Sequence, residues 1–180
     1  MKQNYQFCFR PVNSLGQRQS FGLFCPKEGQ KPMFGSKNNS AVKPSQRDLQ
    51  KAIMILGCLV AMSDGKADQA EISRMKSTAA RMPLFANNSV EEDEAVLEDA
   101  ALTYDRDVLK AVHWATDTLQ YDNWRAVAMC YMCEVVMADG SVDDNEIKIL
   151  NGMCNDLNLS ADEAEAIFQT FRVYYQPYAA

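Results

Sequence analysis

From residue 46 onward, apolar residues recur at the three- and four-residue spacing of helices that face a core. The most apolar stretch covers residues 46–62, where two apolar stripes follow the same helix. A helix that is apolar nearly all round is buried, so we expect this helix at the centre of the domain. The pattern predicts an all-α fold of about seven helices: 46–62, 69–81, one starting after Ser89, 107–119, 123–137, 144–157, and one from Ser160 to about 175.

Residues 1–45 lack this helical spacing. Two short aromatic runs, Tyr5–Phe9 and Ser20–Cys25, have β-strand composition, and turn-forming residues lie between them. They are compatible with a short hairpin, followed by a linker rich in Gly, Pro, Ser and Asn. We therefore divide the chain into a non-helical N-terminal extension, residues 1–45, and a helical domain, residues 46–180.

A stretch of the helical domain occurs twice. Residues 62–72 read MSDGKADQAEI and residues 137–147 read MADGSVDDNEI, and the shared residues keep one constant offset, from Asp64 to Asp139 for example. The match extends into the flanking helices without a gap, which indicates an internal two-fold repeat covering about residues 46–88 and 121–159. We call residues 62–68 the first acidic turn and residues 137–143 the second.

Each acidic turn joins two helices. Gly65 and Gly140 can adopt the positive φ that ends a helix. The spacing also allows a capping box at the start of the next helix, with Asp68 or Asp143 as N-cap and a glutamate three residues later. The spacing of some residues matches the calcium-binding loop of an EF-hand. Val60 and Met62, however, stand where the first oxygen ligands would be, so we exclude an EF-hand.

The paired SDGKADQAE and ADGSVDDNE segments, each after a buried helix, resemble the TerB family of tellurite-resistance proteins. The resemblance covers about Ser45 to Tyr175. It implies an all-helical fold of two similar halves and a role in resistance to tellurite and related envelope or phage stress, with membrane-associated Ter proteins as partners. The basic, aromatic extension is not part of the family pattern.

Charge separates the two parts of the chain. Residues 1–47 carry eight Lys or Arg and one Glu (+7), whereas residues 48–180 carry ten basic and 23 acidic residues (−13). Three interpretations remain open: the extension docks on the acidic body, it meets an anionic partner, or it is a solvated tail. The basic residues are scattered and lack an RNA-binding signature, so we expect no specific nucleic acid. With neither a membrane-spanning run nor a secretory signal, the sequence predicts a cytoplasmic protein without membrane insertion.

The sequence does not favour an enzyme. It contains no glycine-rich phosphate loop and no nucleophile elbow, and its one histidine, His113, has no partnered nucleophile. Cys130 and Cys133 form a CxxC within a helical apolar pattern and are expected to be core residues.

The candidate site is a set of carboxylates in the two acidic turns. An all-oxygen ligand set suits Ca²⁺, Mg²⁺ or Mn²⁺ better than Zn²⁺. The competing explanation is helix capping, which accounts for four of the six carboxylates. We therefore expect a TerB-like, non-enzymatic stress-response module that acts by protein interaction, with divalent-cation binding as a further hypothesis; the alternative is a metal-dependent enzyme or a phage-defence adaptor that uses the same cluster. The candidate metal ligands are Asp64, Asp68, Glu71, Asp139, Asp143 and Glu146.

Overall fold

The computed structural model of the chain describes residues 6–8, 22–24, 43–63, 65, 69–121, 123–137, 142 and 144–175. Seven helices occupy the described part of the body, as the apolar spacing predicted. Each predicted boundary lies within one or two residues of the observed one. The helices are α1 (Gln46–Ala61), α2 (Gln69–Ala80), α3 (Val90–Arg106), α4 (Val108–Thr118), α5 (Trp124–Met137), α6 (Asp144–Asp156) and α7 (Ala161–Tyr174).

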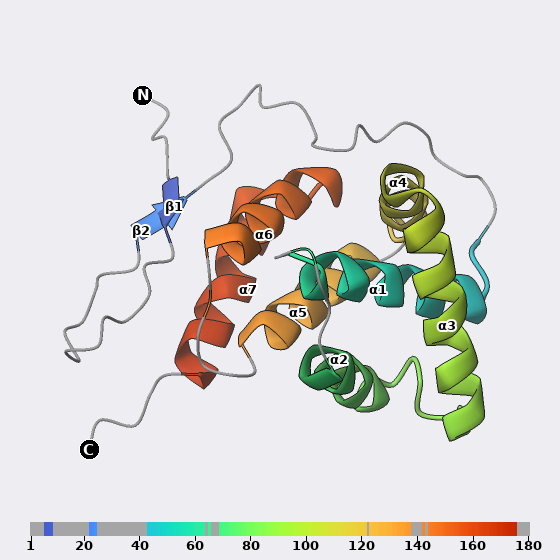
Figure 1. Ribbon diagram of the computed structural model, residues 1–180. Coiled ribbons are helices and arrows are strands. Elements are labelled where there is room, and N and C mark those ends of the chain that lie inside the picture. The colour runs from blue at the N-terminus through green and yellow to red at the C-terminus, as the bar shows by residue number, and fades with distance from the viewer. Residues whose placement is uncertain are drawn as a thin grey trace, which may run out of the picture.

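Helix α1 is the centre of the domain. It packs against α2, α3, α4, α5 and α6, and every residue from Ala52 to Ala61 is buried. Figure 1 shows α3 and α4 on one side of α1, with α2 and α5 beside it and α6 and α7 beyond α5. The two apolar stripes of α1 are thus both covered, which is why this helix can be apolar nearly all round.

Side-chain caps fix the starts of four helices. Ser45, Ser89 and Ser160 each accept a hydrogen bond from the backbone amide three residues later, and an acidic side chain at that position accepts one from the cap in return. Each of these three pairs is a complete capping box. Asp107 caps α4 and also ends α3, so a single residue joins those two helices.

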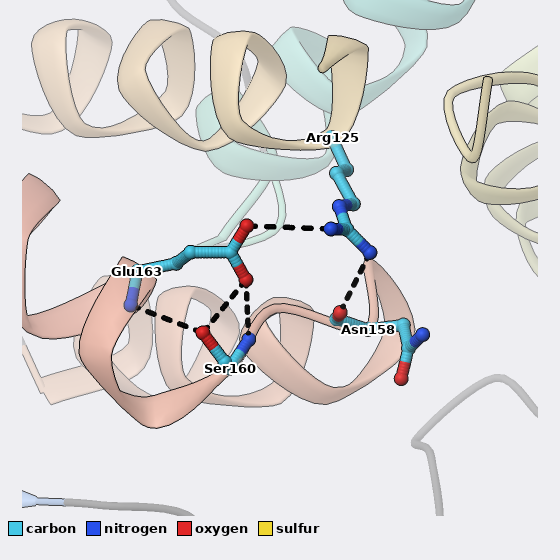
Figure 2. A network of polar contacts seen from close by, with 4 residues as sticks. All are labelled: Arg125, Asn158, Ser160 and Glu163. Atoms are coloured by element: carbon cyan, nitrogen blue, oxygen red, sulfur yellow. Dashed lines mark hydrogen bonds and ion pairs between the residues drawn. The ribbon is translucent and has the colours of Figure 1, made fainter. Parts of the chain in front are cut away.

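Helix α7 is fixed to α5 and to the end of α6 by the polar network in Figure 2. Asn158 has a φ of 52°, and the amide of Leu159 donates to the carbonyl of Cys154, which closes α6 with a Schellman motif. The Arg125 guanidinium donates to the Asn158 carbonyl at 3.2 Å and pairs with the Glu163 carboxylate at 3.3 Å. One arginine therefore joins the cap of α6 to the capping box of α7.

In the N-terminal extension, β1 (Gln6–Cys8) pairs antiparallel with β2 (Gly22–Phe24), and Phe7 lies opposite Leu23. Each strand falls within one of the two β-prone runs. In the body, α2 and α6 begin at Gln69 and Asp144, which keeps the offset of the sequence repeat. The internal two-fold repeat of the structure stays a prediction.

Candidate functional site

The described part of the candidate site consists of two glutamates. Glu71 is the third residue of α2 and Glu146 the third residue of α6, and both side chains are partly buried. They therefore occupy equivalent positions, one at the start of each helix that follows an acidic turn. The other four predicted ligands, Asp64, Asp68, Asp139 and Asp143, lie outside the described residues, and so does the predicted N-cap role of Asp68 and Asp143.

Gly65 has the backbone conformation that the sequence predicted. Its φ is 96°, and its amide donates to the carbonyl of Met62 at 3.0 Å. A β carbon built at this position would meet nothing within 4 Å. Glycine is favoured at this position because its φ is positive, and not because a larger side chain would meet a neighbouring atom. This hydrogen bond lies directly after the end of α1.

Both acidic turns begin near the point where α1 and α5 cross. The crossing is marked by contact between Gly57 and Tyr131. Helix α1 ends four residues after Gly57, at Ala61, and α5 ends six residues after Tyr131, at Met137. At 1.5 Å per residue these ends lie about 6 and 9 Å from the crossing, and helix axes in contact are about 8–10 Å apart. The two ends are therefore within about 25 Å of each other.

Arg74 is a residue of this region that the sequence analysis missed. It lies one helical turn after Glu71 on α2, and its guanidinium donates to the carbonyl of Val135, in the last turn of α5, at 3.5 Å. The helix that follows the first acidic turn therefore reaches the place where the second one begins. No motif marks Arg74, and the repeat has Ile149 at the equivalent position, so only the folded structure reveals this contact.

A family model described as tellurite resistance protein TerB matches residues 50–169. The chain belongs to the TerB family. Its fold is also similar to the crystal structure of a protein of unknown function from Porphyromonas gingivalis, with a TM-score of 0.50, 18% identity, and coverage of 75% of this chain and 97% of that one. Among curated proteins, no sequence matched. At this identity the structural likeness concerns the fold alone.

Three of the four cysteines of the TerB domain pack in its core. Cys58, Cys133 and Cys154 are buried, Cys130 is partly exposed, and all four are free thiols. Burial raises the pKa of Cys58 to about 12 and that of Cys133 well above its ordinary value. Cys133 of the CxxC is therefore part of the hydrophobic core, as predicted, whereas Cys130 is only partly buried and lies outside the core. Within the described ranges, no group of three or more His, Cys, Asp or Glu residues is arranged to hold a metal ion.

Structural contacts account for most of the acidic run at the start of α3 in this TerB domain. Glu92 closes the capping box with Ser89, Asp93 accepts a hydrogen bond from Asn88, and Glu94 pairs with Lys76. A hydrogen bond from its own backbone amide, followed by one from Ser89, lowers the pKa of Glu91. This run is explained by helix capping and the helix dipole without a ligand.

Two further polar residues lie close to a polar partner. The His113 Nε2 is 3.1 Å from the Asp117 carboxylate, one turn along α4. Glu134, which interrupts the apolar pattern of α5, pairs with Arg81 at the end of α2. Of the helices in the described ranges, none has the length and apolar character needed to cross a bilayer.

Proposed function

We propose that this member of the TerB family is a non-enzymatic module that acts in a stress response through protein interaction, and that a divalent cation binds at the end of the domain where the two acidic turns begin. The observation that carries the proposal is the bond from Arg74 to the carbonyl of Val135. It supports a short distance between the turns, because Arg74 follows the first turn and Val135 precedes the second. Repeated carboxylates on neighbouring turns repel one another, and a cation relieves that repulsion.

The chemistry of the turns favours a hard cation. The four aspartates and the two glutamates, Glu71 and Glu146, offer only oxygen, which Ca²⁺, Mg²⁺ and Mn²⁺ accept. Arg74 brings a fixed positive charge to the same end of the domain, and it would hold part of the acidic charge in place when no metal is bound. A cation bound there would change the charge and shape of one surface, which is how a binding module can respond to an ion.

The test is thermal and chemical unfolding of full-length protein that has been stripped with a chelator, with and without each of the three cations. A cation present at about a hundred times its dissociation constant should add about 2.7 kcal/mol to the free energy of unfolding. Changing Asp64 and Asp139 to Asn should remove that gain. A matched control removes two exposed carboxylates elsewhere, with Glu94→Gln on α3 and Asp162→Asn on α7, and should keep it. No shift with any of the cations would leave the turns as helix caps.

The interaction part of the proposal has its own test. Full-length protein and the Asp64→Asn/Asp139→Asn variant would serve as baits, with and without the cation that stabilises the protein. A specific partner should be retained by the wild type and lost by the variant, while the Glu94→Gln/Asp162→Asn control retains it. A partner retained equally by all three proteins would place the interaction surface away from the acidic turns.

A further inference from the structure

The junction of α3 and α4 exposes large apolar side chains. Leu102 is 58% exposed and lies one turn before the end of α3, and Leu109, near the start of α4, is 65% exposed. Val108 beside it is 37% exposed. Only Asp107 separates the two helices, so the two leucines are no more than about 15 Å apart. We call Leu102, Val108 and Leu109 the α3–α4 corner.

Carboxylates flank this corner. Glu98 and Asp105 stand four residues before and three residues after Leu102, which places both next to it on the surface of α3. Both are exposed, and neither forms an ion pair with another described residue. Residues 98–110 as a whole carry four acidic and two basic residues, a net charge of −2. A ligand that suits the corner therefore combines apolar anchors with positive charge.

One segment of the same chain has this chemistry. Residues 31–37 read KPMFGSK: Met33 and Phe34 are apolar, and Lys31 and Lys37 flank them, giving a net charge of +2. The segment precedes Lys43, whose ammonium lies 5.8 Å from the centre of the Tyr121 ring, just beyond the end of α4. Positions 121 and 109 are about 18 Å apart along the helix direction, and the nine residues from Phe34 to Lys43 span up to about 30 Å. The corner is therefore within reach.

We propose that residues 31–37 dock on the α3–α4 corner of their own chain, with Met33 and Phe34 against the leucines and the two lysines beside Glu98 and Asp105. The short tether sets an effective concentration in the millimolar range, so weak contacts are sufficient. When docked, residues 31–37 cover the α3–α4 corner and prevent another basic, apolar segment from binding there. The proposal is independent of cation binding at the acidic turns.

Site-specific photo-crosslinking in full-length protein tests the docking. Benzoylphenylalanine replaces Leu109 or, as a control at a similarly exposed site (70%), Val173 on α7. After illumination, mass spectrometry identifies the joined peptides, and the mass of the intact product distinguishes a bond within one chain from a bond between two copies. We expect the label at position 109 to join residues 31–37 within one chain, and the label at position 173 to do so at least threefold less.

Charge reversal supplies the decisive comparison. Lys31→Glu with Lys37→Glu should lower the yield from position 109 at least threefold, and adding Glu98→Lys with Asp105→Lys should restore it to within twofold of the original. Raising the salt concentration from about 50 to 500 mM should lower the original yield because it screens surface charges. Products that join two copies, products with another segment, equal yields from both label positions, or no effect of charge reversal would each overturn the proposal. Circular dichroism confirms that each variant is folded.

Discussion

The hydroxyl of Tyr131 on α5 lies over Gly57 on α1, so close that a β carbon at position 57 would be 2.7 Å from the hydroxyl oxygen. The same hydroxyl donates to the carbonyl of Met75 on α2 at 3.4 Å. Tyr131 is buried, and burial raises its pKa. Three helices therefore meet at one hydroxyl, and Gly57 is the residue that lets α1 and α5 approach closely enough for this contact.

Gly57→Ala should destabilise the domain. Alanine improves helix propensity by about 1 kcal/mol, but overpacking a buried contact costs about 1–3 kcal/mol. We expect a net loss of about 1 kcal/mol in the free energy of unfolding, measured by urea denaturation with an unchanged m-value. The flexible end of Met75, at 2.9 Å from the same β carbon, can move aside and does not decide the outcome.

The matched comparison is the same change in a Tyr131→Phe background. Phenylalanine removes the oxygen that the new methyl would meet, so Gly57→Ala should then be nearly neutral. The coupling energy in the double-mutant cycle should be about 1 kcal/mol, with the double mutant more stable than the sum of the single changes predicts. Additivity within about 0.4 kcal/mol would show that α1 and α5 adjust their separation without strain.

Two residues with positive φ provide a second prediction. Gly65 has a φ of 96° and Asn158 a φ of 52°. Gly65→Ala should lower the free energy of unfolding by about 1 kcal/mol through backbone strain alone, because no atom lies where the methyl group would be. For Asn158, the change to Gly should leave the free energy of unfolding unchanged or raise it slightly, whereas the change to Ala should lower it by about 1 kcal/mol. A Gly65→Ala variant as stable as the wild type would show that the first acidic turn adopts another conformation in solution.

Local signals explain why the helices could be predicted so closely. Ser160 and Glu163 stand three residues apart, and that spacing alone specifies a capping box. The uninterrupted apolar run of α1 likewise identified the central helix, because only a helix covered on all sides can have that composition. The start of α4 was predicted one residue too early, at Asp107. Asp107 is the N-cap, and the first helical residue is Val108.

Contacts between distant residues could not be predicted in this way. The bonds from Arg74 to Val135 and from Arg125 to Glu163 join residues that lie 61 and 38 positions apart. Neither arginine belongs to a periodic pattern or a motif, and each could equally have been a solvated surface residue. For the candidate site, the repeat located the acidic turns along the chain, but their separation depends on where α1 and α5 cross, and Gly57 carries no sequence signal of that crossing.

The carboxyl group of Glu163 is expected to make the stability of the fold sensitive to acid. The hydrogen bond from the Ser160 backbone amide, followed by that from its hydroxyl and by Arg125, lowers the pKa of Glu163. A carboxyl group whose pKa is lower in the folded state stabilises the fold above the pKa of the unfolded state, about 4.3, and this contribution is lost as the pH falls through the folded-state pKa. The free energy of unfolding should therefore fall below about pH 5, and less steeply in Glu163→Gln, which keeps the side-chain shape.

The control for this pH prediction is Asp162→Asn. Asp162 is an exposed carboxylate next to Glu163 in the first turn of α7, and its change removes the same charge without touching the bonds to Ser160. Urea denaturation between about pH 3 and 7 gives the three profiles. If Glu163→Gln and Asp162→Asn flatten the profile equally, the effect comes from net charge and not from the capping box.

The last prediction concerns the boundary near residue 45. The capping box joins Ser45, the last residue of the extension, to Asp48 in the helical domain, and the cap needs no residue before position 45. A protein that begins at Ser45 therefore retains the start of α1 and all seven helices, and we expect it to unfold cooperatively with a melting temperature within a few degrees of the full-length value. Docking of residues 31–37 on an exposed corner would add little to stability, since surface charge pairs contribute at most about 1 kcal/mol each. The measurement is a thermal melt followed by circular dichroism, compared with a protein that begins at Leu49 and so loses the cap, which should melt several degrees lower. If the protein that begins at Ser45 is unfolded, the aromatic residues of the extension belong to the core and the division of the chain at residue 45 is wrong.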